Sequence, residues 1–163
     1  MADVILRPIV ELDSPKIYAV ALEAWRFTYR GIFPQEFIDT FVKKHYSAEA
    51  IVPLFPRMEA GTLFFHVAED EQGIVGFCNI GISEEGAQLF RIYLLPSHMR
   101  RGIGWNLLSL GEEFLAKSRV QEYFCFVHEQ NEIGRQFYAK HGFRHIRNKD
   151  RAGEWYLEKT LSQ

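Results

Sequence analysis

One stretch of the sequence limits the possible folds of this chain more than any other: an apolar run, a short basic loop with two glycines, and a helix directly behind it. Residues 87–95 have the composition of a β-strand, which Pro96 ends. From Gly102 onward, apolar residues recur at helical spacing. The first N–H groups of such a helix have no partner within it and carry the positive end of its dipole. The stretch therefore predicts an anion site, most simply one for a pyrophosphate.

The loop itself has a composition that suits phosphate oxygens. Gly102 and Gly104 have no Cβ, so a ligand can approach their backbone closely, and Arg100 and Arg101 add positive charge. Two common phosphate loops are absent, because no Gly-Lys-Ser/Thr occurs and the dinucleotide fingerprint lacks its third glycine. A tight strand-to-helix turn without any ligand would have the same two glycines, so this segment alone leaves both interpretations open.

A second patterned segment follows further along the chain. Residues 122–127 predict a strand, Asn131 begins a helix, and Tyr138 lies two turns later on the same helix face. Gly142 is placed to end that helix in a left-handed conformation. The segment therefore puts an asparagine and a tyrosine on one side of a helix that starts where a strand ends.

Together and in this order, the two segments resemble the GNAT superfamily of acetyl-CoA-dependent N-acetyltransferases. The family's Arg/Gln-x-x-Gly-x-Gly/Ala loop aligns with residues 99–104. Its second signature matches Asn131, Phe137, Tyr138, Gly142 and Phe143. One departure is Met99, which stands where the family usually has Arg or Gln. The resemblance then leaves side-chain contact with the pyrophosphate to Arg100 or Arg101.

The resemblance also implies where acetyl-CoA binds and which residue acts on it. The backbone of Ile92, Tyr93 and Leu94 would pair with the pantetheine arm between two splayed strands. Asn131 would hydrogen-bond to the cofactor, and Tyr138 would protonate the departing thiolate, as a phenol with a pKa of about 10 can. The pyrophosphate would lie on Arg100, Arg101, Gly102, Ile103, Gly104 and Trp105. In the competing interpretation Tyr138 is only a core aromatic, and no carboxylate stands out as the base that deprotonates the amine.

The acceptor site of this family commonly lies between the first two helices. Trp25 and Tyr29 share a helix face there, where they either stack on an acceptor or belong to the core. The pattern Trp-x-x-x-Tyr-x-Gly-Ile, with Arg91-Ile-Tyr-Leu and Val127-His128 ahead of Asn131, resembles the PaiA-type polyamine acetyltransferases. It implies spermidine or spermine as the small-molecule acceptor. Carboxylates that could line a groove for such a polycation are Glu23, Glu36, Asp39, Glu84 and Glu85.

The whole chain, residues 1–163, predicts one α/β (α+β) domain, because no linker or repeat divides it. We expect a GNAT-like central mixed, mostly antiparallel sheet of six to seven strands with helices on both faces. Strands are predicted at 4–10, 62–68, 74–82, 87–95, 122–127, 143–147 and 154–158. Pro8 places the first of these at a sheet edge. Helices are predicted from Asp13, Pro34, Ser47 (to about Met58), Gly102 and Asn131 (to His141).

Composition and motifs argue against several other classes of function. Nineteen basic and twenty-one acidic side chains give a net charge of −2, which disfavours nucleic acid as a partner. No apolar run approaches the ~20 residues of a membrane span. His128-Glu129 lacks the second histidine of a zinc-protease motif, and no metal is expected.

The N-terminus and the cysteines indicate the cytoplasm. The chain begins without the basic segment and long apolar stretch of a signal peptide. Cys78 and Cys125 each lie in an apolar run, as buried reduced thiols do. The family resemblance also implies a possible homodimer paired through sheet edges. The competing hypothesis is a catalytically idle domain of the same fold that binds acyl-CoA as a sensor or interaction module, and release of CoA as a product separates the two.

Overall fold

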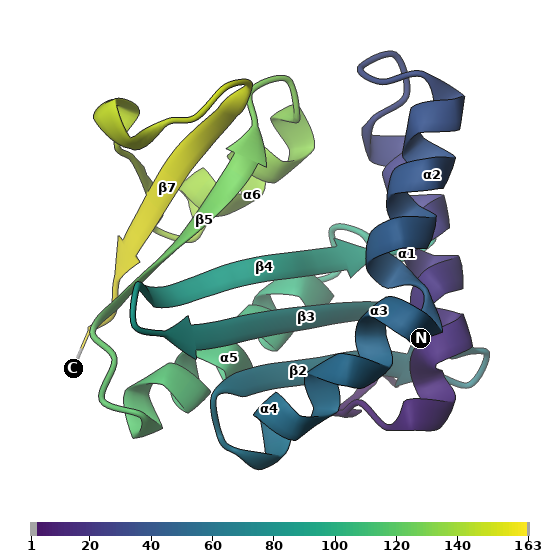
Figure 1. Cartoon of the computed structure of the whole chain (residues 1–163), viewed down its shortest axis with the longest axis horizontal. Coiled ribbons are helices and arrows are strands. Elements are labelled where there is room, and N and C mark those ends of the chain that lie inside the picture. The colour runs from purple at the N-terminus through teal and green to yellow at the C-terminus, as the bar shows by residue number, and fades with distance from the viewer. Residues whose placement is uncertain (1–2, 163) are drawn as a thin grey trace.

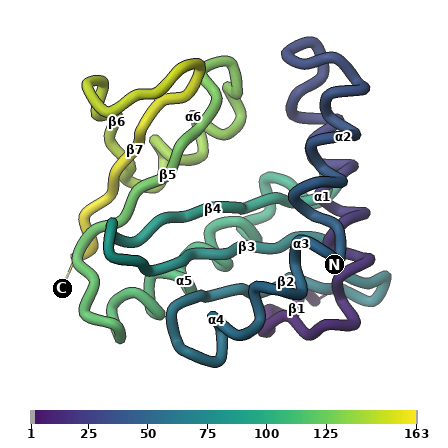
Figure 2. Tube along the Cα trace, viewed as in Figure 1, coloured from purple at the N-terminus to yellow at the C-terminus, as the bar shows by residue number. Residues whose placement is uncertain are grey.

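A mixed sheet of seven strands organises residues 3–162, the part of the chain that this computed structural model describes. The strand order is β1-β2-β3-β4-β5-β7-β6, and only the β4–β5 pairing is parallel. The strands are β1 (Ile5–Pro8), β2 (Leu63–Asp70), β3 (Gly73–Ser83), β4 (Gly86–Leu94), β5 (Glu122–His128), β6 (Arg144–His145) and β7 (Glu154–Thr160). This confirms the predicted mixed, mostly antiparallel sheet and the edge position of the first strand, which Figure 2 traces beside β2.

Helices cover both faces of this sheet (Figure 1). The α-helices are α1 (Ser14–Thr28), α2 (Gln35–Tyr46), α3 (Ala48–Ile51), α4 (Phe55–Glu59), α5 (Ile103–Lys117) and α6 (Glu132–Lys140). Side chains of α1, α2 and α3 share one buried cluster with β2 and β3, whereas α5 shares a second cluster with strands β2 to β5. Within the described residues no helix is long and apolar enough to cross a membrane.

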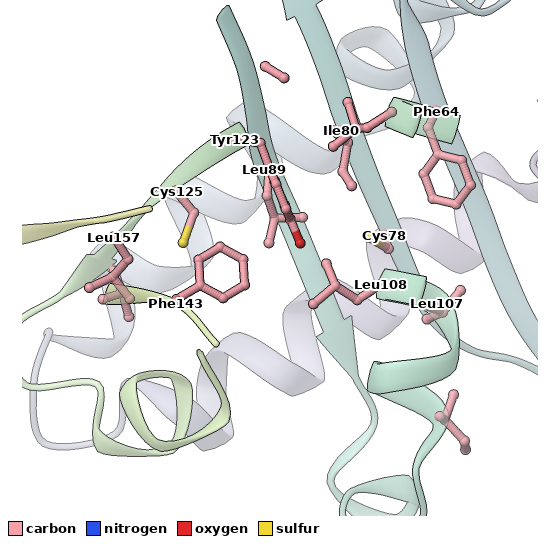
Figure 3. Packing of buried hydrophobic residues seen from close by; sticks show 14 of the residues in the cluster. Phe64, Cys78, Ile80, Leu89, Leu107, Leu108, Tyr123, Cys125, Phe143 and Leu157 are labelled. Atoms are coloured by element: carbon pink, nitrogen blue, oxygen red, sulfur yellow. The ribbon is translucent and has the colours of Figure 1, made fainter. Parts of the chain in front are cut away.

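Strand burial follows from this layering. In β5 the buried side chains alternate, because only one face of that strand packs on the second cluster. In β3, Phe77 and Cys78 are adjacent yet both fully buried, since helices cover both faces there. Figure 3 shows Cys78 and Cys125 among the apolar side chains of the second cluster. Both cysteines are free and buried, which confirms the prediction, and this burial raises the pKa of both thiols.

Two predicted elements differ in the structure. The single helix predicted from Ser47 to Met58 is divided into α3, a 3-10 helix Val52–Leu54 and α4. Pro53 and Pro56 each occupy the start of a new segment, because proline has no N–H to donate within a helix. The strand predicted at 143–147 is only the two residues of β6.

The strand β6 is short because the chain turns away after it. A 3-10 helix, Arg147–Lys149, follows directly, and the Asp150 carboxylate fixes the turn. It accepts hydrogen bonds from the His145 ring at 2.9 Å and from the backbone N–H of Tyr156 at 2.7 Å. Asp150 thus links the end of β6, through His145, to β7, through Tyr156.

The feature that creates the functional cleft is the divergence of β4 and β5 (Figure 1). Their parallel pairing joins Ala87 to Tyr123 and Gln88 to Phe124 and extends no further in the described chain. Opposite β3, the register shifts so that Phe90 is an extra residue in β4. Such a bulge bends a strand and increases its twist, so β4 turns away from β5 after this point.

Gly76 holds β3 close to the diverging part of β4, and its substitution tests that packing. A Cβ at Gly76 would overlap the Leu94 side chain and lie 2.9 Å from the Tyr93 backbone oxygen. Because backbone cannot move aside cheaply, we expect Gly76→Ala to lower the free energy of unfolding by about 1–3 kcal/mol in urea denaturation.

Gly81→Ala is the matched control in the same strand. There a Cβ would meet side chains rather than backbone: Arg57 and Phe90 closely, and Leu63 at an ordinary contact distance of 3.6 Å. We expect a smaller loss than at Gly76, and an equal loss in both variants would contradict the role given to the β4 backbone.

Candidate active site

A cavity of about 1090 Å³ lies between the diverging ends of β4 and β5. Its wall continues over the end of α1, the loop that joins β4 to α5, the first turn of α5 and one side of α6. This volume lies just above the usual range for small-molecule sites, about 300–1,000 Å³, so the cavity suits an extended ligand.

Most of the residues predicted for the site meet in this cavity. Its lining includes Tyr29, Ile92, Tyr93, Leu94, Arg100, Gly102, Gly104, Trp105, Asn131 and Tyr138. The side chains of three others lie elsewhere. Arg101 is exposed, Ile103 is buried in the second core cluster, and Trp25 is buried in the first, with its ring centroid 4.5 Å from that of Phe41. Of the two predicted acceptor residues, only Tyr29 reaches the cavity.

The loop before α5 has the backbone shape of an anion site. Gly102 has φ +83° and stands at the N-cap position of α5, where no side chain caps the helix. Arg100 also has a left-handed backbone, with φ +63°. The free N–H groups of the first helical turn therefore point out of the helix, next to a cationic side chain.

Gly104 serves a second purpose besides the close ligand approach that the sequence suggests. A Cβ there would lie 3.1 Å from Cε1 of Phe137, which projects from α6. The missing side chain thus brings α6 against the first turn of α5, in addition to leaving that turn accessible from the cavity.

Asn131 both lines the cavity and begins α6. Its side-chain oxygen accepts a hydrogen bond from the Gly134 N–H at 2.9 Å, which caps the helix, and the residue is 8% exposed. Its amide nitrogen remains as a donor for other groups. The predicted ligand contact can use that nitrogen.

Tyr138 is half-buried at the cavity wall, where the rings of Phe137 and Phe143 pack edge-on against it at 5.5 Å and 5.2 Å. Burial raises the pKa of Tyr138 well above its ordinary value. The phenol therefore keeps its proton throughout the neutral range and can donate it.

Several lining residues on α6 were missed by sequence reasoning, among them Gln136, Lys140 and His141. His141 stacks on Trp105 with ring centroids 4.7 Å apart and nearly parallel planes. Burial and the charges of Lys140 and Lys159 lower the pKa of His141, so its ring is neutral near pH 7. Gln136 and Lys140 are four residues apart, and Lys140 and His141 follow Phe137 by three and four residues, a helical spacing that could have found them.

On the other side of the cleft, two further rings lie against Tyr29, although only Tyr29 itself lines the cavity. Tyr29, Phe33 and His128, here called the aromatic mouth, have centroid separations of 5.0–6.3 Å. The N–H of Gln130 donates to Nδ1 of His128 at 3.1 Å, which leaves Nε2 as the protonated nitrogen of the neutral ring. Such a cluster presents aromatic faces to a cation.

One carboxylate adjoins the aromatic mouth. Glu154 on β7 pairs with His128 on β5. The pKa of Tyr29 is raised mainly by burial of the phenol, and the negative charge of Glu154 raises it further. Its present partner is Arg151, at 2.9 Å. The carboxylates predicted from sequence do not line the cavity, and Asp39 is bound to Arg26 at 3.1 Å.

Comparison with known proteins agrees with this geometry. Residues 61–145 match the family described as acetyltransferase (GNAT) domain. Spermidine N(1)-acetyltransferase of Thermoplasma acidophilum is 32% identical over 133 residues, which cover 81% of this chain and 83% of that protein. The uncharacterised N-acetyltransferase YuaI of Bacillus subtilis is 33% identical over 125 residues, covering 73% and 68%.

A solved structure is similar along almost the whole chain. The PaiA N-acetyltransferase of Thermoplasma acidophilum, in complex with coenzyme A, superposes with a TM-score of 0.92 at 29% identity, covering 98% of this chain and 99% of that one. The matched family and the 32% identical relative show that this chain belongs to the GNAT family of acetyl-CoA-dependent N-acetyltransferases.

Proposed function

We propose that this enzyme acetylates a primary amine of a polyamine, such as spermidine or spermine, by direct attack in a ternary complex. The observation that carries the proposal is the continuity of the cavity, which joins the loop before α5 and Tyr138 to the side that bears Tyr29. The similarity to a spermidine acetyltransferase supports the choice of acceptor.

The residues of the cavity fit acetyl-CoA. The N–H groups at the start of α5, with Arg100, suit a pyrophosphate, and the side of β4 that has no strand partner beyond Gln88 suits a pantetheine arm. Acetyl-CoA supplies the acetyl group as a thioester. Unpaired N–H groups of β4 are the available donors for the carbonyl oxygen that gathers charge during attack.

Tyr138 acts as the general acid in this proposal. Its phenol holds a proton at neutral pH and lies in the wall of the cavity, so it can hand the proton to the thiolate as the C–S bond breaks. The proton that the amine loses as its nitrogen bonds to the acetyl carbon restores the phenol, so the products are the amide and the CoA thiol. The half-buried ring is held by Phe137 and Phe143, which fixes the direction of the hydroxyl.

Tyr138→Phe tests this assignment. The variant keeps the ring and removes the acid, so we expect kcat to fall about 100-fold while the Kd for acetyl-CoA stays within about twofold. Thiol release measured with a thiol reagent gives kcat, and calorimetry gives Kd. Tyr156→Phe is the matched control, because Tyr156 does not line the cavity. Equal losses in the two variants would contradict a specific role for Tyr138.

The raised pKa of Tyr138 also predicts a pH profile. A general acid with a pKa well above 10 stays protonated as the pH rises, so kcat of the wild type should not decline between about pH 8 and pH 10. Free CoA separated by chromatography measures the rate at each pH. A fall of kcat with a midpoint below about pH 9 would argue for another acid.

The acceptor enters by the aromatic mouth in this proposal. Aromatic faces attract an alkylammonium group, and Glu154 adds an opposite charge beside them. Glu154 is 37% exposed and already paired with Arg151, so its contribution to binding an amine is modest.

Glu154→Gln tests the acceptor site. We expect the KM for spermidine to rise about three- to fivefold at saturating acetyl-CoA, the ratio that corresponds to one partly exposed charge pair. Glu85→Gln is the control, since Glu85 is exposed in the β3–β4 turn and does not line the cavity. An unchanged KM in the Glu154 variant would remove this carboxylate from the site.

A panel of spermidine, spermine, a lysine peptide and an aminoglycoside tests the acceptor class itself. A faster rate of thiol release with the polyamines than with the other amines supports the proposal, whereas a faster rate with the lysine peptide would contradict it. Binding of acetyl-CoA without release for any amine would favour the sensor hypothesis. The cytoplasmic location and the homodimer stay predictions.

A further inference from the structure

One side-chain hydrogen bond ties the loop between β4 and α5 to the end of another strand. His98 lies in the 3-10 helix Pro96–His98, and its Nε2 is 2.9 Å from Oδ2 of Asp70, the last residue of β2. Both side chains are largely buried, with exposed fractions of 11% and 7%. Neither lines the cavity.

The surrounding hydrogen bonds fix the orientation of both groups. Oδ1 of Asp70 accepts from the backbone N–H of Gln72 at 2.9 Å, so both carboxylate oxygens are engaged. Oγ of Ser97 lies 2.8 Å from Nδ1 of His98. When the Ser97 hydroxyl donates to Nδ1, the neutral ring carries its proton on Nε2 and donates it to Asp70. The hydrogen bond from His98 lowers the pKa of Asp70, which keeps the acceptor ionised.

The backbone beyond His98 needs such a fixed point. Two residues later Arg100 has φ +63°, a conformation that non-glycine residues rarely adopt, and Gly102 follows with φ +83°. Backbone of this kind persists only where its surroundings determine it. Within residues 3–162, no other side-chain hydrogen bond or ion pair connects residues 95–102 to another part of the chain.

We infer that Asp70 and His98 are positioning residues, which hold the loop in the shape that binds the pyrophosphate of acetyl-CoA. They act through the loop, because the proposed anion site is formed by Arg100 and the start of α5 rather than by the His98–Asp70 hydrogen bond itself. The inference rests on the cofactor site proposed above. It adds the β2–β3 turn, which lies outside the cavity, to the parts of the fold that set cofactor affinity.

The test compares binding of acetyl-CoA by calorimetry in the wild type, His98→Ala, Asp70→Ala and the double variant. We expect Kd to rise about tenfold in each single variant, as for loss of one hydrogen bond to a charged group, and no further in the double variant. With acetyl-CoA saturating, kcat should stay within about twofold. His98→Gln keeps an N–H donor and should recover most of the affinity.

The chain offers a matched control pair. Nε2 of His145 lies 2.9 Å from Oδ2 of Asp150, whose other oxygen also accepts a backbone N–H, and neither residue lines the cavity. His145→Ala should leave the Kd for acetyl-CoA unchanged. An equal rise in this control would overturn the inference, because it would show that any lost pair of this kind weakens binding.

A shortened substrate separates positioning from general loss of structure. S-acetylpantetheine has no pyrophosphate, so kcat/KM for it should be the same in His98→Ala and the wild type. A loss equal to that seen with acetyl-CoA would overturn the inference. If either alanine variant unfolds at the assay temperature, Asp70→Asn, which removes the charge of the acceptor, carries the same comparison, with His98→Gln as the conservative control. Binding of acetyl-CoA is measured without an acceptor, so a wrong choice of amine would leave this result unaffected.

Discussion

The short parallel contact between β4 and β5 is the constraint on which the rest of the structure depends. Within the described residues, β4 pairs with β5 only at Ala87 and Gln88, and the bulge at Phe90 then turns it away. A sheet interior normally satisfies each N–H and C=O through its neighbours. Here the unpaired side of β4 faces a cavity, so a ligand can take the place of the missing strand. The wall on the other side stays in place because β7 pairs with β5 along its whole length, from Glu122 to His128.

Close packing at glycines then sets the shape of that cavity. Gly76 allows β3 to lie directly against the backbone of β4, and Gly104 allows Phe137 of α6 to touch the first turn of α5. The ring of His141 packs on Phe137 and on Trp105, which links α6 to α5 a second time. The anion site and the proposed acid therefore lie on two helices whose separation is fixed by ring contacts. A change at Gly104 would move one relative to the other without altering a reactive group.

Local patterns predicted the strands, the two signature helices and the left-handed Gly142 because each is decided by a few neighbouring residues. Such patterns could not predict whether a side chain on a helix face packs in the core or lines the cavity. Trp25 and Tyr29 share a face at helical spacing, yet Trp25 packs in the core and only Tyr29 reaches the cavity. Glu154 was missed because its position beside the aromatic mouth comes from the pairing of β5 with β7. The contact between Asp70 and His98 likewise joins two strand ends that only the folded sheet brings together.

The charges on the acceptor side limit how a polycation can bind there, because the protein's own cations already cover other aromatic faces. The Arg151 guanidinium lies 3.6 Å from the centroid of Phe126, and the Lys149 ammonium lies 5.0 Å from that of Tyr156. A polyamine laid along these rings would have to displace both or meet like charge at close range. The aromatic mouth beside Glu154 is free of such a cation over its rings in the described chain. In the proposed site, one ammonium group of the acceptor binds at the aromatic mouth while a second amine of the same molecule lies inside the cleft. The site therefore selects acceptors by the spacing between two amines rather than by their total charge.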